Sequence, residues 1–486
     1  MSARWQEAEP CREGTALVVK DDQGARLELG YHELPIAPWH ASSEPPCIKS
    51  VQLAGGALLV QTSQGDHRIE LSDLEARAKS TLVLHNTSFV MTCDGEGLGL
   101  VAKGAVVVVG DRIAWVGTAD QVESCALDLG KATRIDLGGR LLTPGLIDCH
   151  AHPLFAGRRA AEFERRARGD HYREIAKEGG GINATVEPTR SASISEHVGL
   201  CGRRMQQALA WGTTTMEAKS GYDLSVEGEL RLLRIANMVD ALQPVDLVPT
   251  LLGAHALPKE YASDREGFIK SVCEEMIPRA AQAGLATAVD VYCDEGAFTL
   301  AETRRILTRA KTEGLEIKAH IGQFADLGGA QLLAELAALS GDHLEQVSEE
   351  GLAAMASASV VATMLPGACV QLKMQPPPVA GMRKAGVKMA LASDLNPGTS
   401  HSETLTLPMW LATTHFGMTV EEAWLGVTTH AATALGGKHI DSPTIGKIKV
   451  GMQADLVAWD AELPAEIPYH FGVNLVHAVV KKGKLV

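Results

Sequence analysis

One repeated pattern constrains the fold of this chain: a short apolar, β-branched run is followed by a longer segment with helical periodicity. Residues 198–211 and 330–339 are two of the helical segments. Parallel strands need long crossover connections, so strands that alternate with helices are typical of a parallel sheet covered by helices. Eight runs in succession predict a (β/α)8 barrel of the TIM type. The runs are residues 141–149, 212–219, 246–252, 288–292, 316–320, 342–345, 360–365 and 387–394.

The segments on either side of this pattern are also rich in strands. Residues 82–86 and 105–113 precede it, and residues 454–460 and 478–485 follow it with similar alternation. We expect these two groups to pair into one β-sandwich that brackets the barrel. The predicted domains are a β-rich extension of unknown role at 1–76, a composite β-sandwich at 77–142 and 445–486, and the barrel at 143–444.

Composition excludes several classes of protein. The 486 residues carry a formal net charge of −14, which gives no basis for nucleic-acid binding. The N-terminus is polar, and no apolar run approaches the length of a membrane-spanning helix, about 18 residues. The nine cysteines are scattered and form no Cys-X-X-Cys motif, as is typical of reduced thiols. We expect a cytoplasmic enzyme that acts on a small molecule.

Potential metal ligands occur where the predicted strands end. His150 and His152 end the first run, His320 ends the fifth, and Asp394 ends the eighth. The carboxyl ends of barrel strands meet at one rim, and residues two apart on a strand point the same way. Three imidazoles and one carboxylate suit zinc or ferrous iron with a position left for water. We predict one divalent ion per chain, zinc or iron.

Lys219 raises the alternative of two metals bridged by a carbamylated lysine. In barrels that use such a lysine, it sits on the fourth strand. Lys219 ends the second predicted strand. We therefore expect one metal and not two.

Several longer motifs occur in order after residue 80. They are residues 144–152, 154–159, 179–182, 217–222, 252–256, 394–399 and 446–457. Through them the chain resembles the imidazolonepropionase family of the amidohydrolase superfamily. That family opens the ring of 4-imidazolone-5-propanoate with water to give N-formimidoyl-L-glutamate, a step of histidine degradation. The resemblance implies a small anionic heterocyclic substrate and a homodimer, and it does not cover residues 1–76.

The resemblance also implies roles for individual residues. His150, His152, His320 and Asp394 would hold the metal. Asp394 is the candidate base that takes a proton from the attacking water and passes it to the leaving ring nitrogen. His343 would hydrogen-bond Asp394 or the water, and a purely orienting role for it is equally open.

Substrate binding requires groups for a carboxylate and for a polar ring. By resemblance, Arg159 would bind the carboxylate through its guanidinium. His255 would face the ring or its oxygen. The further contacts that the resemblance implies are Tyr172, Tyr222, Asn396, Gly398 and Thr399.

Gln323 follows His320 by three residues, where deaminases of the superfamily usually have a glutamate. An amide cannot shuttle a proton, but it can hydrogen-bond a ring nitrogen, so we include Gln323 among the catalytic and substrate-binding residues. The amide counts against a cytosine- or adenosine-type deaminase. Two alternatives stay open: a metal-dependent deaminase or cyclic-amide hydrolase acting on another anionic heterocycle, and a catalytically silent binding protein.

Four residues depart from the family pattern: Ala151, Pro153, Asp223 and Ser393. Asp223 matters most, because it follows Tyr222 and replaces a usual glycine. A new carboxylate at this point could alter the charge of the pocket or the geometry of the loop, so it leaves the substrate somewhat open. Because no predicted ligand lies in residues 1–76, we expect their deletion to spare turnover.

Overall fold

The computed structural model describes most of the chain. From residue 80 onward the description is continuous apart from three short gaps. The described residues are 5–11, 16–21, 26–34, 40–41, 44–54, 57–70, 80–170, 174–175, 178–436 and 444–486.

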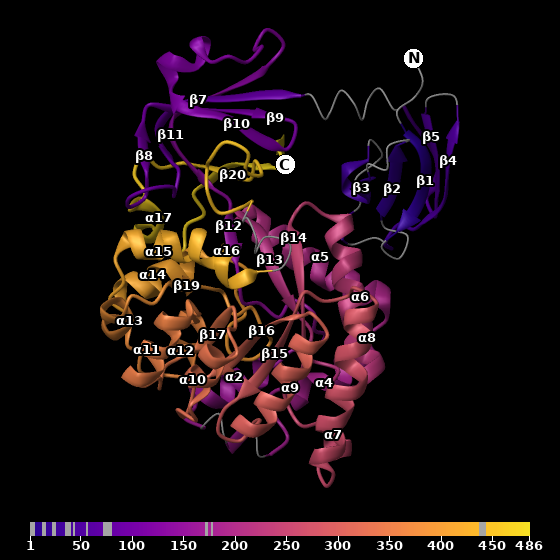
Figure 1. The fold of residues 1–486 in the computed structure, drawn as a ribbon, viewed down its shortest axis with the longest axis vertical. Helices are drawn as coiled ribbons and strands as arrows, with labels where there is room; N and C mark the ends of the chain where they lie inside the picture. Colours follow the sequence, from indigo (N-terminus) through magenta and orange to yellow (C-terminus); the bar gives the residue numbers. More distant parts are fainter. Residues whose placement is uncertain are drawn as a thin grey trace.

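Eight parallel strands in chain order form the centre of the molecule (Figure 1). Each strand pairs with the next one along the chain, and helices fill the connections. The prediction of a (β/α)8 barrel from the alternating runs is confirmed. The barrel strands are β12 (Leu146–Asp148), β13 (Thr213–Lys219), β14 (Asp246–Ala254), β15 (Ala288–Cys293), β16 (Glu316–Ile321), β17 (Ser340–His343), β18 (Val361–Met364) and β19 (Met389–Leu391).

Backbone bonds beyond the strand ends close the barrel between β19 and β12. The amide of Asp394 donates to the carbonyl of His150 at 3.0 Å, and the amide of His152 donates to the carbonyl of Leu395 at 2.8 Å. His150, His152 and Asp394 lie just after the ends of β12 and β19, and their backbone groups join these two strand ends.

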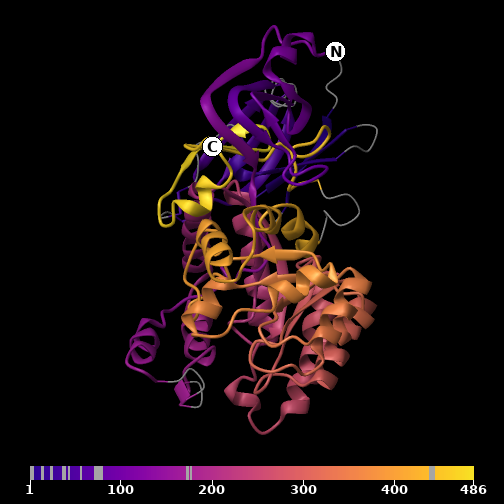
Figure 2. The same cartoon turned by 90° about the vertical axis from the view of Figure 1, so that its left-hand side faces the viewer.

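Helices surround the barrel (Figure 2). Several begin where the sequence supplies a capping side chain: Ser193, Ser225, Thr299 and Thr419 each accept a backbone N–H of the first turn. The helices are α2 (Ala160–Ala167), α4 (Asn183–Ser191), α5 (Ile194–Ala210), α6 (Val226–Leu242), α7 (Arg265–Ser271), α8 (Ile277–Gln282), α9 (Leu300–Thr312), α10 (Gly329–Glu335), α11 (Glu349–Ala358), α12 (Pro366–Gln371), α13 (Val379–Ala385), α14 (Thr406–Thr414), α15 (Val420–Gly426), α16 (Thr429–Leu435) and α17 (Glu466–Tyr469). None of the helices in the described residues is both long enough and apolar enough to cross a membrane.

Strands from both flanks of the barrel join in one eight-stranded sheet. Its central strand β11 (Thr133–Pro144) pairs in parallel with β7 (Thr81–Met91) and antiparallel with β20 (Leu456–Trp459). Side chains of all three strands share one buried cluster, so the sheet curls around its own core, as expected for a β-sandwich. The other strands are β8 (Leu100–Ala102), β9 (Gly104–Val109), β10 (Arg112–Thr118), β21 (Val476–Lys481) and β22 (Lys484–Leu485).

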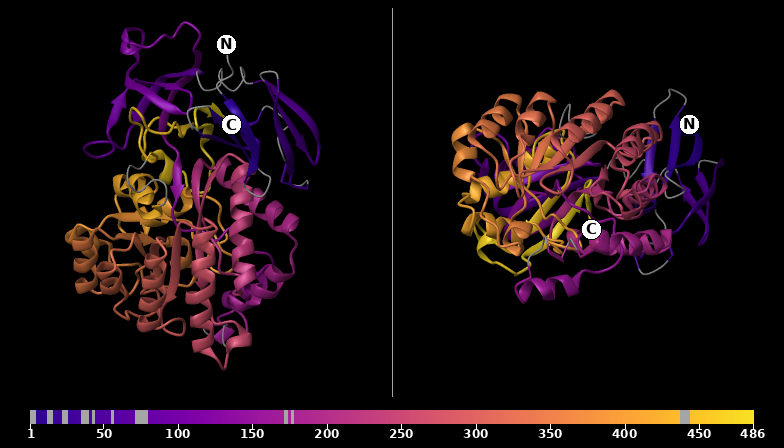
Figure 3. Two further views of the ribbon diagram at one scale, coloured as in Figure 1. Left: turned by 45° about the vertical axis from the view of Figure 1, so that its right-hand side comes forward. Right: turned by 90° about the horizontal axis from the view of Figure 1, so that it is seen from below.

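The N-terminal extension contains two three-stranded antiparallel sheets that lie beside α5 and α6 (Figure 3). Leu58 and Val60 share a buried cluster with Val198 and Met205 of α5 and with Ile235 of α6. The extension therefore covers an apolar face of the barrel's outer helices. Its strands are β1 (Trp5–Cys11), β2 (Ala16–Asp21), β3 (Arg26–Gly30), β4 (Ile48–Ala54), β5 (Ala57–Thr62) and β6 (Gly65–Glu70).

This packing predicts what deletion of residues 1–76 does. The truncated chain should keep its turnover per metal-loaded molecule, because no proposed ligand is removed. It should lose several kcal/mol of stability, since burying one such aliphatic side chain contributes about 1.5–3 kcal/mol. Thermal unfolding with a parallel activity assay checks both parts. An unchanged Tm would mean that the contact with α5 and α6 adds no stability.

Candidate active site

Three histidines and one aspartate meet at one rim of the barrel. His150 and His152 follow β12, His320 lies in β16, and Asp394 follows β19. One nitrogen of each imidazole lies within 4.8 Å of the other two. Asp394 Oδ1 lies 3.5 Å from Nε2 of both His150 and His152. All four side chains are buried, and the structure thus brings together the four residues predicted as metal ligands.

Two aspartates orient two of these imidazoles. Asp342 Oδ2 lies 2.6 Å from His150 Nδ1, and Asp290 Oδ1 lies 3.0 Å from His320 Nδ1. Because each carboxylate accepts a hydrogen bond from the protonated Nδ1, the Nε2 atom of each ring keeps its lone pair for an ion. Carboxylates hold metal-binding histidines in this way in many proteins.

The protonation states of this cluster fit a divalent cation. Burial lowers the pKa of His152 and holds that of His150 well below its ordinary value, so both rings are neutral. Burial alone would raise the pKa of Asp394, but the neighbouring imidazoles, His152 first, outweigh it and the pKa is lowered. The Nε2 atoms of His150 and His152 approach to 3.3 Å, and His152 Nδ1 is buried without a hydrogen-bond partner among the described residues. Neutral imidazoles and an ionised carboxylate suit zinc or ferrous iron.

The backbone at this rim adopts positive φ angles at three residues with side chains. These angles are 50° at Asp394, 81° at His343 and 71° at Leu344. Each costs about 1 kcal/mol or more, and such conformations persist only where the surrounding structure imposes them. Two of these residues, Asp394 and His343, have side chains that line a small cavity beside the histidine cluster.

His343 lies near both the histidine cluster and the buried carboxylate of Glu345. Its ring centroid is 5.5 Å from that of His320, and its Nδ1 is 3.7 Å from Glu345 Oε2. Burial alone would lower the pKa of His343, but the carboxylates of Glu345, Asp394 and Asp342 together outweigh it, so the pKa is raised. His343 therefore holds a proton more readily than His150, His152 and His255, whose pKa values are lowered.

Arg159 approaches the cavity from the loop before α2. Its Nη2 and Nε donate to Glu162 Oε2 at 2.8 and 3.0 Å, and only 5% of the residue is exposed. Any side chain at Gly398 would clash with the guanidinium. Gly398, predicted as a substrate contact, thus provides the close backbone surface against which Arg159 rests.

Asn396 shapes the loop after β19. Its Oδ1 accepts the backbone N–H groups of Gly398 and Thr399, both at 2.7 Å, and its Nδ2 donates to the carbonyl of Asp394 at 2.7 Å. Asn396 and Thr399 also line the cavity. The Asn396 amide therefore fixes the loop that carries Asp394.

Tyr222 and His255 form another part of the cavity wall. Their rings meet edge to face with centroids 5.2 Å apart, and His255 also stacks on His152 at 5.2 Å. His255 Nδ1 donates to the carbonyl of Gly221 at 2.8 Å. The buried Glu229 carboxylate of α6 accepts the amide of Gly221 at 2.6 Å, so this α6 side chain fixes the loop that positions both rings.

Gln323 has its amide orientation set by Tyr292. The Tyr292 hydroxyl donates to Gln323 Oε1 at 2.7 Å, and both residues line the cavity. With its oxygen engaged, Gln323 has its NH2 group available to donate to a ligand. Sequence reasoning missed Tyr292, which is the fifth residue of a strand run and gave no separate signal.

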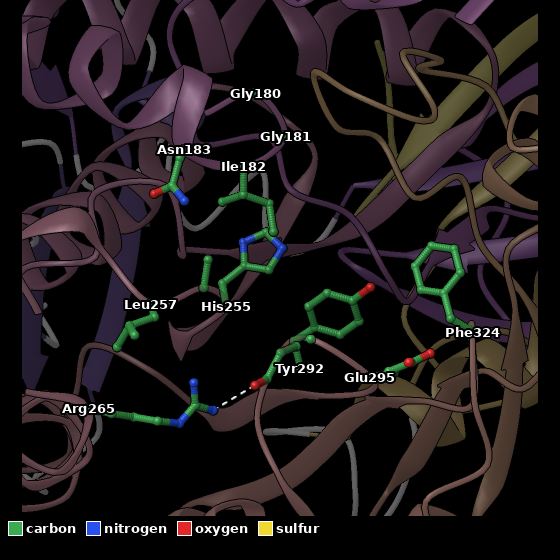
Figure 4. A pocket seen from close by; sticks show the side chains of 13 residues that line it. Gly180, Gly181, Ile182, Asn183, His255, Leu257, Arg265, Tyr292, Glu295 and Phe324 are labelled. Atoms are coloured by element: carbon green, nitrogen blue, oxygen red, sulfur yellow. Dashed lines mark hydrogen bonds between the residues drawn. The ribbon is translucent and has the colours of Figure 1, made fainter. Parts of the chain in front are cut away.

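A wider hollow of about 440 Å³ adjoins this cavity, and the two share Ile182, His255 and Tyr292 (Figure 4). In the close-up, the rings of His255 and Tyr292 lie at its centre, with the segment of Gly180 and Gly181 along one side. The glycine-rich motif at residues 179–182 therefore borders the hollow that adjoins the cavity.

The structure brings most of the predicted site residues to one cavity. His150 belongs to the cluster but does not itself line the cavity, Gly398 lies behind Arg159, and Tyr172 falls outside the described residues. The predicted residues that line the cavity are His152, Arg159, Tyr222, His255, His320, Gln323, His343, Asp394, Asn396 and Thr399.

Asp223 does not line this cavity. Its carboxylate contacts Arg231 at 3.3 Å and Arg190 at 3.5 Å, and it lines a separate hollow with both arginines. The expectation that Asp223 changes the charge of the substrate pocket is therefore not supported: Tyr222 points into the cavity and the next residue points away from it.

We expect Asp223→Asn to leave KM within about twofold and to lower stability by about 1–2 kcal/mol, because two partly exposed arginines lose their charged partner. Steady-state kinetics and chemical denaturation measure the two effects. Tyr222→Phe is the comparison at the neighbouring position that does face the cavity. A large rise of KM in Asp223→Asn alone would contradict this orientation.

Comparisons with known proteins agree with the fold and with the predicted resemblance. A model of the amidohydrolase family matches residues 272–486. Together with the barrel and its histidine cluster, this match makes the chain a member of the amidohydrolase class. An imidazolonepropionase of Rhizorhabdus wittichii is 47% identical over 81% of this chain and 96% of its own length. One of Paracoccus denitrificans is 46% identical over 83% and 100%. The chain belongs to the imidazolonepropionase family.

Solved structures with lower identity share the fold. A triazine hydrolase variant has a TM-score of 0.61 at 16% identity and covers 84% of this chain and 94% of its own. Ochratoxinase of A. niger has a TM-score of 0.60 at 18% identity, with 84% and 95% covered. A mutant atrazine chlorohydrolase of Arthrobacter aurescens, complexed with zinc and atraton, has a TM-score of 0.60 at 15% identity, with 83% and 94% covered.

Proposed function

We propose that this protein hydrolyses 4-imidazolone-5-propanoate to N-formimidoyl-L-glutamate, a step of histidine degradation. It is a hydrolase of a cyclic amide by its family. The observation that carries the assignment is one cavity in which the imidazole cluster, the Asp394 carboxylate and the Arg159 guanidinium face a common space. A substrate with a cyclic amide at one end and a carboxylate at the other matches these groups.

One zinc or iron ion per chain, held by His150, His152, His320 and Asp394, would polarise the ring carbonyl and lower the pKa of the attacking water. The rest of the reaction depends on protein groups. Asp394 is ionised and lies beside His150 and His152, so it can take the proton of the water. It then returns this proton to the ring nitrogen that leaves.

His343 supports this proton transfer from the side of β17. The nearby Glu345 carboxylate favours its protonated form, so His343 can donate a hydrogen bond to Asp394 or to the developing charge on the substrate. Replacing His343 or Glu345 should affect kcat more than KM, because the hydrogen bond from His343 strengthens as charge develops in the transition state.

Substrate orientation rests on groups around the cavity. Arg159 would bind the propanoate carboxylate by its guanidinium, and the Gln323 NH2 group would donate to the heterocycle. Tyr222 and His255 would contact the ring faces and edges, and Asn396, Gly398 and Thr399 would hold the opposite loop. Tyr172 is proposed by family resemblance alone.

The decisive assay mixes metal-quantified protein with freshly prepared imidazolone propanoate and follows the loss of its ultraviolet absorbance. The expected product, identified by mass, is N-formimidoyl-glutamate. Ammonia release would instead favour a deaminase, and tight metal binding with no turnover of any anionic heterocycle would favour a binding protein.

We also propose that the protein is a homodimer located in the cytoplasm. Analytical ultracentrifugation measures its oligomeric state. The eight free cysteines among the described residues support a reducing compartment.

A further inference from the structure

A group of charged side chains lies buried inside the barrel beneath the histidine cluster. Glu217, Lys219, Asp290, Lys318 and Asp342 all have fully buried side chains. Barrel interiors are usually filled with branched apolar residues, and burial of charges carries a large desolvation cost. Charges retained at such a position call for a role.

Lys219 connects the two carboxylates that orient the imidazoles. Its Nζ lies 2.5 Å from Asp290 Oδ2 and 3.9 Å from Asp342 Oδ2, and also 2.9 Å from Glu217 Oε2. The other oxygen of Asp290 faces His320 Nδ1, while Asp342 Oδ2 faces His150 Nδ1. One ammonium group therefore contacts both supports of the cluster.

The same two aspartates form a second possible cation site. Ligand atoms of His150, Asp290 and Asp342 lie within 4.8 Å of one another, a spacing that a metal ion could use. The Lys219 ammonium lies against both carboxylates of this group. Burial alone would lower the pKa of Lys219, but Asp290, Glu217 and Asp342 together outweigh it and the pKa is raised, which favours the ammonium form.

We propose that Lys219 is an internal cation that takes the position of a second metal ion and holds Asp290 and Asp342 so that His320 and His150 face a single ion. Lys219 is a positioning residue and touches no substrate. The inference deepens the proposed function, since it rests on the metal site of His150, His152, His320 and Asp394. A cation already held between Asp290 and Asp342 would explain why one metal ion binds and not two, although His150, Asp290 and Asp342 offer a second set of ligand atoms.

Lys318 provides a matched control. It is equally buried in the barrel, but its Nζ contacts Glu217 Oε1 at 2.9 Å and the carbonyl of Cys149 at 3.0 Å. Its bonds therefore avoid the two aspartates that hold the imidazoles. A general effect of removing a buried lysine should appear in both variants, whereas a positioning effect should appear only at Lys219.

The test compares metal binding by Lys219→Met and Lys318→Met. Zinc affinity is measured by competition with a chelator, and zinc per chain by elemental analysis, with circular dichroism as the measure of folding. We expect Lys219→Met to weaken zinc binding about 10- to 100-fold, as loss of support for metal-bound histidines does, and Lys318→Met to change it less than about threefold. Equal losses in the two variants, or none at Lys219, would overturn the proposal.

A second measurement uses the unaltered protein and can overturn the proposal even if Lys219→Met does not fold. X-ray absorption of the zinc-saturated protein should detect no zinc–zinc distance of about 3.5–4 Å, the separation in two-metal sites. Such a distance would overturn the proposal. Both readouts are independent of turnover, so failure of the imidazolone propanoate assay would count against the proposed function and not against this role of Lys219.

Discussion

Replacing His320 with alanine should abolish metal binding and turnover together. His320 supplies one of three imidazoles in the cluster, and its loss leaves the Asp290 carboxylate without the Nδ1 group that it accepts. Loss of a support residue alone typically costs 10- to 100-fold in metal affinity, so loss of a ligand should cost at least about 100-fold. Elemental analysis of the purified variant and kcat at saturating substrate measure the two effects.

A buried histidine outside the cluster serves as the control. His197 is buried and its Nε2 bonds the carbonyl of Thr189 at 2.9 Å, so His197→Gln should keep its metal. If His320→Ala retained one tightly bound metal per chain, the ligand set proposed here would be wrong. If it lost activity but kept the metal, His320 would act on the substrate and not on the ion.

Replacing Arg159 with alanine should keep the metal and raise KM about 100-fold. A charge-assisted, forked hydrogen bond to a carboxylate contributes about 1.5–3 kcal/mol. The loss also leaves Glu162 as an unbalanced negative charge near the anionic substrate, since Arg159 is its partner at 2.8 Å. Steady-state kinetics and metal content of the variant test this expectation, and kcat should change by only a few-fold.

Arg165, on the helix α2 that follows Arg159, offers a control. Its side chain is 40% exposed and pairs with Asp170 and Glu178, away from the cavity residues, so Arg165→Ala should have little effect on KM. An imidazolone that lacks the propanoate tail adds a second comparison. The wild type and Arg159→Ala should turn it over with equal KM if the guanidinium binds the carboxylate, and an unaltered KM for the natural substrate would refute this role.

The barrel and the cluster of three histidines with Asp394 could be predicted from the sequence because both follow from local patterns. Strand and helix periodicities alternate eight times, and parallel strands deliver their last residues to the same rim. His320 and Asp394 could therefore be assigned to one site although they are far apart in the chain. The unusual spacing of His150 and His152 added a local signal.

The buried charges beneath the cluster could not be predicted in the same way. Asp290 and Asp342 lie in the barrel strands β15 and β17, and local periodicity does not identify which charges meet across the interior of a barrel. Their signal was present as ionisable residues in otherwise apolar runs. The orientation of Asp223 was equally hidden, since it depends on the loop after β13, where Gly221 and Leu224 have positive φ angles of 105° and 61°.

Closure of the barrel has a consequence for how the protein is made. The bonds from Asp394 to His150 and from His152 to Leu395 join the first strand to the last. During synthesis, the first two histidines leave the ribosome long before the carboxylate that completes their site. A chain interrupted before β19 therefore holds His150 and His152 but lacks Asp394, so the cluster of three histidines and one aspartate is complete only after the last barrel strand has been made.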